Sequence, residues 1–171
     1  MLYFLYISSQ LRKYWILLIL SIIILISIML YIQYFYFIKP CILCVYQRCA
    51  LFGIAIAGII TVIAPSILIL RFLGISIWIY SAYKGLLLAK KHITILFQSS
   101  PFITCDLFIN FPNWLPLNKW CPMIFDAVIR NCTVYPWYFL SFEISQWMFF
   151  IFSSYLIIAL FIIISQFIYL K

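Results

Sequence analysis

The sequence predicts an all-α membrane protein, a four-transmembrane-helix bundle with a long loop between the third and fourth helices. Hydrophobic residues make up 68% of the 171 residues, charged residues make up 8%, and the mean hydropathy is +1.21. Soluble domains are about half apolar and about a quarter charged. Three uncharged runs, at residues 14–38, 49–70 and 144–170, are long enough for the ~20 residues that cross the hydrocarbon core. The whole chain, residues 1–171, is therefore expected to be one integral membrane domain.

The first helix is expected at about residues 14–37, directly after Arg12 and Lys13. Two basic residues before an apolar run resemble a signal peptide in outline. The run is too long for the apolar part of a cleaved signal, and no Ala-x-Ala site follows it. We therefore predict an uncleaved first span whose terminal tyrosines lie in the interfacial aromatic belt.

The second helix is expected at about residues 42–64. Lys39 precedes a proline and is biased away from helical dihedrals, whereas Pro40 can stand near the start of a helix. Ala64, Pro65 and Ser66 close this helix. Small residues along it favour the close approach of a neighbouring helix, and they are Gly53, Ala55, Ala57 and Gly58.

The third helix is expected at about residues 72–89 and the fourth at about residues 146–168. Lys84 lies within the third span, so its side chain must extend toward an interface or face the bundle. The loop between these helices, at about residues 92–143, contains all three acidic residues and three cysteines. Its segment 108–120 is too short and too broken by proline to span, and its two tryptophans favour a position along the membrane surface.

A Cys-x-x-Cys motif opens the second helix. Cys41 and Cys44 share one face of its first turn and are close enough for a disulfide. The unpaired amides of a helix N-terminus favour a thiolate, and Arg48 adds a cation on the same face. A disulfide between the two would close a very small loop and constrain little of the unfolded chain. The motif therefore predicts a redox centre rather than a structural crosslink.

A metal site is the alternative interpretation of the same cysteines. Zinc or an iron-sulfur cluster needs four soft ligands, which Cys41, Cys44 and two loop cysteines could supply. The loop contains no second closely spaced pair, however, and His92 is the only histidine. Disulfide exchange between one pair at the helix start and one pair in the loop is favoured, and no metal is expected.

The formal charge of +8 does not indicate nucleic-acid binding. The basic residues are scattered singly or in pairs, and no basic stripe interleaved with aromatic residues is present. Because the basic residues are scattered, the positive-inside rule does not predict which way the protein is oriented in the membrane. Four spans bring the first and third loops to one side, and paired cysteines on a membrane face favour an oxidising space such as the periplasm. Cys49, inside the second span, is expected to be a small apolar residue.

An ordered set of motifs covers nearly the whole sequence: Pro40-Cys41-x-Leu43-Cys44-x-Tyr46-x-Arg48, Ser100-Pro101-Phe102-x-Thr104-Cys105-Asp106, Trp114-Leu115-Pro116-Leu117-x-Lys119-Trp120, Cys132 and Gln146-Trp147. In the order and spacing of these motifs the chain resembles the disulfide bond formation protein B (DsbB) family.

The resemblance implies an enzyme of the bacterial inner membrane that reoxidises the periplasmic dithiol oxidase DsbA. It also implies that the electrons pass to ubiquinone, or to menaquinone when respiration is anaerobic. Carried over residue by residue, Cys105 and Cys132 form the loop disulfide, and reduced DsbA attacks Cys105. Cys41 and Cys44 are then the quinone-facing pair, and the quinone site consists of Cys44, Arg48 and His92.

Several alternatives stay open at the level of the sequence. Arg48 could extend to the interface, His92 could be an ordinary interfacial residue, and Cys121 is either incidental or an accessory resolving thiol. The protein could be a quinone-linked thiol oxidase for a dedicated partner, or a four-span protein with structural disulfides. A vitamin K epoxide reductase type shares the chemistry, but its Cys-x-x-Cys is expected near a late helix.

Overall fold

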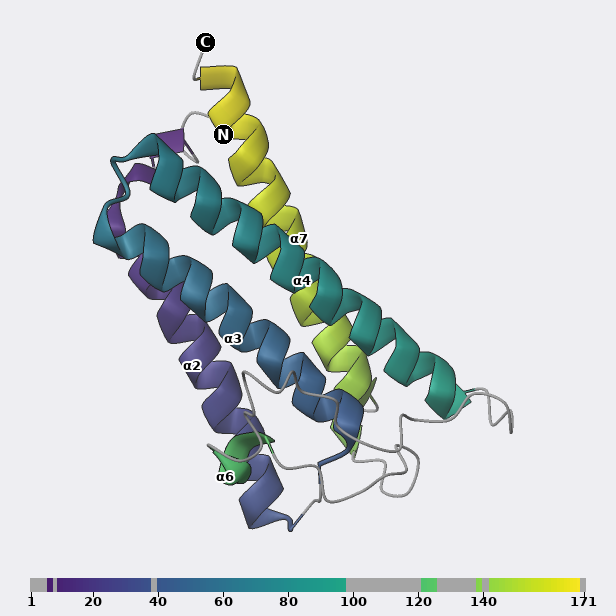
Figure 1. Cartoon of the computed structure of the whole chain (residues 1–171). Helices are drawn as coiled ribbons and strands as arrows, with labels where there is room; N and C mark the ends of the chain where they lie inside the picture. The colour runs from purple at the N-terminus through teal and green to yellow at the C-terminus, as the bar shows by residue number, and fades with distance from the viewer. Residues whose placement is uncertain are drawn as a thin grey trace, which may run out of the picture.

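Four long helices form the structure, which is a computed structural model. They are α2 (Arg12–Phe35), α3 (Ile42–Ile63), α4 (Leu68–Phe97) and α7 (Ile144–Tyr169), and each is long and apolar enough to cross a membrane. The predicted all-α four-span architecture is thereby confirmed (Figure 1). The residues that the structure describes are 6–7, 9–37, 40–97, 121–125, 138–139 and 142–169.

Short elements accompany the four long helices in the described part of the chain. The four-residue helix α6 (Pro122–Phe125) lies near the C-terminal end of α2 (Figure 1). The strands β1 (Tyr138–Phe139) and β2 (Phe142–Glu143) pair antiparallel, with Tyr138 opposite Glu143. Because β2 ends where α7 begins, this small hairpin leads directly into the fourth span.

The third span is longer than the sequence predicted. Helix α4 has 30 residues and extends beyond the expected residues 72–89 at both ends. Arg71, Lys90 and Lys91 bounded the expected span, but arginine and lysine are good helix formers and no glycine or proline lies between Lys91 and Phe97. The prediction that residues 92–97 belong to the loop was therefore wrong, and His92 lies on a helix.

Helix α3 is the central element of the bundle. It packs against α2 on one side and α4 on the other, and α4 packs against α7 (Figure 1). Its span is 56% buried, whereas the spans of α2 and α7 are 22% buried. The core that joins the four helices includes Ile22, Leu51, Ile75 and Phe152, all of them fully buried.

Glycines permit the closest helix contacts. A Cβ atom on Gly53 of α3 would overlap the Ser81 hydroxyl of α4, and one on Gly85 of α4 would overlap the Phe152 ring of α7. The close approach that small residues predicted for the second span therefore occurs at Gly53.

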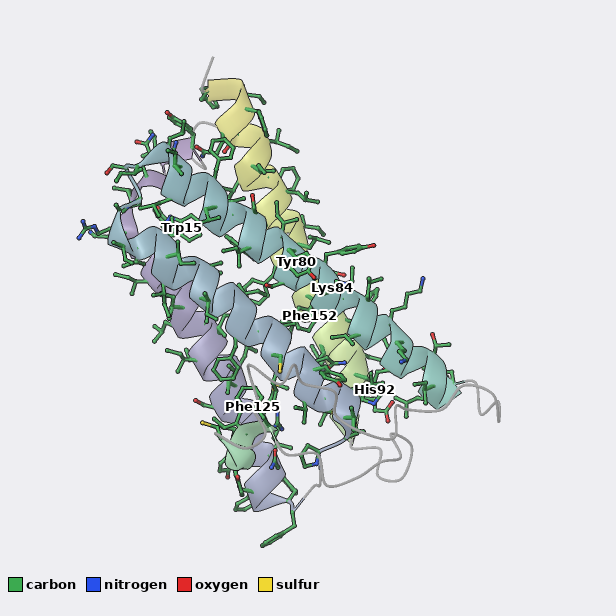
Figure 2. The ribbon with its side chains drawn as sticks, viewed as in Figure 1. Trp15, Tyr80, Lys84, His92, Phe125 and Phe152 are labelled. Atoms are coloured by element: carbon green, nitrogen blue, oxygen red, sulfur yellow. The ribbon has the colours of Figure 1, made fainter. Side chains whose placement is uncertain are left out.

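Lys84 lies on the outer face of α4. Its side chain is exposed and points away from the bundle, with its ammonium 5.7 Å from the ring centroid of Tyr80 (Figure 2). Of the two positions expected for this lysine, the structure therefore excludes the one that faces the bundle.

Polar contacts close the end of the bundle that holds the two termini. Trp15 Nε1 donates to the Ser9 carbonyl oxygen at 2.9 Å, and Gln166 Nε2 donates to Ser9 Oγ at 2.7 Å. A cavity of about 630 Å³ lies between α2 and α7 and is lined almost entirely by apolar side chains, with Ser21 and Tyr155 hydrogen-bonded at its wall. The cysteine motif lies at the opposite end, where α3 begins.

Candidate redox site

Cys41 and Cys44 form a pair at the N-terminus of α3. Cys41 is the N-cap residue, and its sulfur accepts a hydrogen bond from the Cys44 backbone N–H at 3.3 Å. The sulfur thereby takes the role that a serine or aspartate oxygen usually has at a helix start. The two Sγ atoms lie 2.7 Å apart, and both cysteines are free thiols. The Cys-x-x-Cys spacing thus places the two sulfurs next to each other.

The two thiols differ in their surroundings. Cys41 is 7% exposed, whereas Cys44 is half-buried. The hydrogen bond with Cys44, together with burial, raises the pKa of the Cys41 thiol above its ordinary value. Cys44 is the less buried residue of the pair.

His92 reaches this pair from α4. It is buried, and its Nε2 atom lies 3.9 Å from Cys41 Sγ. Leu43 and Ile95 pack beside Cys41 and hold the start of α3 against the last turns of α4. The continuation of α4 past its basic residues therefore decides where the imidazole lies (Figure 2).

Arg48 lies one turn beyond Cys44 and is only 4% exposed. Its Nη2 donates to Gln33 Oε1 of α2 at 2.6 Å, and its Nη1 donates to the Ile124 carbonyl oxygen of α6 at 2.9 Å. The alternative that this arginine extends into the interface does not fit this burial. Both acceptors are neutral, so the guanidinium keeps its positive charge beside the cysteine pair.

Gln33 and helix α6 were not predicted as parts of the site. In the sequence Gln33 falls in a run that is expected at the interface, and α6 follows the surface segment. The ring of Phe125 lies 5.3 Å from that of Phe52, which fixes α6 over α3. The available signal was the need of a buried guanidinium for acceptors, but the sequence does not say which residues supply them.

The remaining cysteines divide into two groups. Cys105 and Cys132, together with segment 108–120, lie outside the described residues, so their expected roles stay predictions. Cys121 is an exposed free thiol, and Cys49 is a half-buried free thiol inside α3. The ligand atoms of Cys41, Cys44 and His92 all lie within 4.8 Å of one another. Among the described residues, the third potential ligand beside Cys41 and Cys44 is thus a histidine and not a loop cysteine.

A buried dithiol at the end of four membrane-spanning helices, with an imidazole and a guanidinium beside it, defines a multi-pass membrane protein equipped for thiol chemistry. Over residues 11–162 the sequence matches the model of the family described as disulfide bond formation protein DsbB. The chain belongs to the DsbB family.

Relatives match the chain over almost its whole length. It is 60% identical over 171 residues to the disulfide bond formation protein B of Blochmanniella pennsylvanica, which covers 100% of this chain and 97% of the relative. The protein of the same name from Blochmanniella floridana is 57% identical over 166 residues, covering 97% of this chain and 95% of the relative. That of Pectobacterium atrosepticum is 49% identical over 166 residues, covering 97% and 93%.

Proposed function

We propose that this chain is a protein-dithiol:quinone oxidoreductase that reoxidises a DsbA-like thiol oxidase and so sustains disulfide bond formation in exported proteins. The name shared by its relatives, disulfide bond formation protein B, supports the first half of this proposal. The observation that carries the second half is the position of Cys44, a half-buried thiol at the end of a membrane-spanning helix with Arg48 one turn away.

Electrons enter through the loop pair in this proposal. A thiolate of the reduced partner attacks Cys105 of a Cys105–Cys132 disulfide, and the resulting mixed disulfide resolves to an oxidised partner and a loop dithiol. The loop dithiol then reduces the Cys41–Cys44 disulfide by the same exchange. Each exchange breaks one sulfur–sulfur bond and forms another, so two electrons reach Cys41 and Cys44.

The residues present fit a quinone as the final acceptor. Arg48 Nε is buried and has no hydrogen-bond acceptor among the described residues, and a quinone oxygen could serve as one. When bound, ubiquinone, or menaquinone under anaerobic conditions, would supply an acceptor for the two electrons and two protons that the dithiol loses on returning to a disulfide.

The protein's own groups have distinct tasks in that last step. Cys44 is the less buried residue of the pair, and the Cys41 sulfur lies 3.9 Å from His92 Nε2, which could take up a proton there. The Arg48 guanidinium stabilises negative charge on the Cys44 sulfur and on the acceptor's oxygen, because a cation acts strongly where water is excluded.

The experiment that tests this function is anaerobic mixing of the purified protein with a reduced DsbA-like dithiol and ubiquinone while quinone absorbance is followed. Cys44→Ser should abolish quinone reduction, because the disulfide cannot re-form. The matched control is Cys49→Ser, a change in the same helix outside the site, which should retain the wild-type rate. Quinone reduction that persists in Cys44→Ser would contradict the proposal.

We also propose that the protein resides in the bacterial inner membrane with both redox pairs facing the periplasm. Four spans bring the start of α3 and the α4–α7 connection to one side. The oxidising compartment supports disulfides on that side.

A further inference from the structure

We propose that the reduced protein binds a divalent zinc-class ion between Cys41, Cys44 and His92, and that this ion arrests the protein in its dithiol state. The binding site stands on the geometry alone. The arrest rests on the proposed function, because only an enzyme that returns the pair to a disulfide can be stopped in this way.

The separations of the three ligand atoms suit such an ion. Zinc–sulfur bonds of ~2.3 Å and zinc–nitrogen bonds of ~2.0 Å in a tetrahedral centre put two sulfurs ~3.7 Å apart and a sulfur and a nitrogen ~3.5 Å apart. Cys41 Sγ and His92 Nε2 are already 3.9 Å apart. The two sulfurs, now 2.7 Å apart, must separate by ~1 Å. Rotation of the half-buried Cys44 side chain supplies this movement.

The three ligands come from two helices, which distinguishes this site from an isolated Cys-x-x-Cys. Cys41 and Cys44 belong to the first turn of α3, and His92 comes from α4, fifty-one residues after Cys41. Packing of Leu43 and Ile95 already fixes the two helices at this point. The ligand set is therefore held together before any ion arrives, and only a side-chain rotation is needed. A tetrahedral ion held by three protein ligands has a fourth position, which water can occupy.

Charge and protonation restrict the site to the reduced protein. Binding breaks two S–H bonds, forms two metal–sulfur bonds and one metal–nitrogen bond, and releases two protons, with no change in oxidation state. A disulfide has no thiolate to offer, so the oxidised pair cannot form the centre. Two thiolates neutralise the divalent ion, so the buried site, which already contains the Arg48 cation, gains no net charge.

The test uses the full-length chain with Cys49, Cys105, Cys121 and Cys132 replaced by serine, so that Cys41 and Cys44 are its only thiols. The protein is reduced in detergent, freed of reductant under nitrogen and titrated with Co²⁺, whose thiolate charge-transfer and tetrahedral d–d bands report the ligands. One equivalent should bind, Zn²⁺ should displace it, and the disulfide form should show no bands.

His92→Ala is the discriminating variant. Loss of a direct ligand should weaken Co²⁺ binding by at least ~10-fold, because changes to mere outer-shell partners already cost ~10- to 100-fold. His92→Cys, which restores a soft ligand, should recover most of the affinity, and circular dichroism checks that both variants remain helical. Unchanged affinity in His92→Ala would overturn the site, and so would equal binding by the disulfide form.

The arrest is measured separately in the wild type. Zn²⁺ added to reduced protein before ubiquinone should block reoxidation of Cys41 and Cys44, and a chelator should restore it. Zn²⁺ added to oxidised protein should not delay the first exchange. Free reoxidation of zinc-loaded protein would overturn the arrest. Absence of quinone turnover in metal-free protein that still gives the Co²⁺ bands would contradict the proposed function and leave the metal site standing.

Discussion

Arg48 shows how single polar residues organise the site. A buried guanidinium is costly unless its donors find acceptors, and here one acceptor comes from the Gln33 side chain and another from the Ile124 carbonyl. Because these acceptors lie on α2 and α6, the direction of the guanidinium depends on two elements outside its own helix. Gln33 is therefore a positioning residue for the charge beside Cys44.

Gln33→Ala should slow quinone reduction by roughly tenfold, which corresponds to ~1.4 kcal/mol. This value is at the lower end for a hydrogen bond to a charged group. The measurement is the rate of quinone reduction by pre-reduced protein across a range of quinone concentrations. Gln10→Ala, at an exposed glutamine, serves as the control and should match the wild type. Equal rates in both variants would contradict the positioning role.

Glu143 is an acidic residue at the start of α7. Its backbone N–H donates to Gln146 Oε1 at 3.1 Å, one half of a capping box, and Ser145 Oγ donates to its carboxylate at 3.4 Å. Burial raises the pKa of Glu143 above its ordinary value, and the Ser145 hydrogen bond offsets part of that shift.

The raised pKa of Glu143 makes a pH-dependent contribution to stability. Between the ordinary pKa of 4.5 and the higher folded value, the folded protein binds more protons than the unfolded chain. The contribution is therefore present below pH 4.5 and is lost as the pH rises through the folded pKa. Glu143→Gln should flatten this part of the profile of melting temperature in detergent between about pH 4 and 7. Parallel profiles for the two proteins would contradict the assignment.

The sequence predicts one part of the site and leaves the other part to the fold. Cys41, Cys44 and Arg48 lie within eight residues on one helix, so helical geometry alone relates them. Gln33 and Ile124 approach Arg48 from other segments, and such contacts depend on how helices dock. His92 was a candidate through family resemblance, but its 3.9 Å distance from Cys41 depends on the length and docking of α4.

At the scale of the helices, the contact between α4 and α7 depends on the absence of a side chain. Gly85 allows the Phe152 ring of α7 to lie directly against the α4 backbone. Phe152 is fully buried in the main core (Figure 2). Any side chain at position 85 must push this ring, and with it α7, away from α4.

Gly85→Val should destabilise the bundle by ~1–3 kcal/mol, the usual cost of overpacking a well-filled core. The measurement is unfolding in mixed micelles with increasing denaturing detergent, followed by circular dichroism. Ser76→Val adds a valine to an exposed position of the same helix, and its stability should stay near that of the wild type. A Gly85→Val protein as stable as Ser76→Val would show that the contact adapts freely.

Helix existence follows from the sequence more directly than helix ends. Long apolar runs with few or no charges identify the four spans because charges are costly in hydrocarbon. The same reasoning places a helix end where charged residues flank the run, and it therefore missed the last turns of α4. Beyond the hydrocarbon a helix continues until backbone preference or a cap ends it. The apolar composition of a run therefore identifies a membrane span, but it does not give the length of the helix.

For the whole molecule, the four spans found among the described residues bring the start of α2 and the end of α7 to the same end of the bundle (Figure 1). The cysteine motif and α6 are at the other end, where α6 contacts Arg48. The turn between α3 and α4, which includes the exposed Ser66, is on the side of the termini.

Single-cysteine variants test the proposed orientation. A protein that keeps only Cys121 should react with a membrane-impermeant maleimide in intact spheroplasts, because this thiol is exposed beside the proposed periplasmic end. A cysteine-free protein carrying Ser66→Cys should react only after permeabilisation. A protein that keeps only Cys49 should resist labelling until denatured, because its thiol lies within a span. If Ser66→Cys reacted in intact spheroplasts and Cys121 reacted only after permeabilisation, the orientation would be opposite to the one proposed.

The length of α4 has a mechanical consequence. Thirty residues at ~1.5 Å each make a helix of ~45 Å, whereas the hydrocarbon core is ~30 Å thick. The helix must project from the bilayer or tilt within it, and the balance between the two depends on local lipid thickness. His92 is near the far end of this long lever, so a small change in tilt moves the imidazole farther than any residue at mid-bilayer. The acyl-chain length of the surrounding lipid is therefore expected to affect the position of His92 beside the cysteine pair.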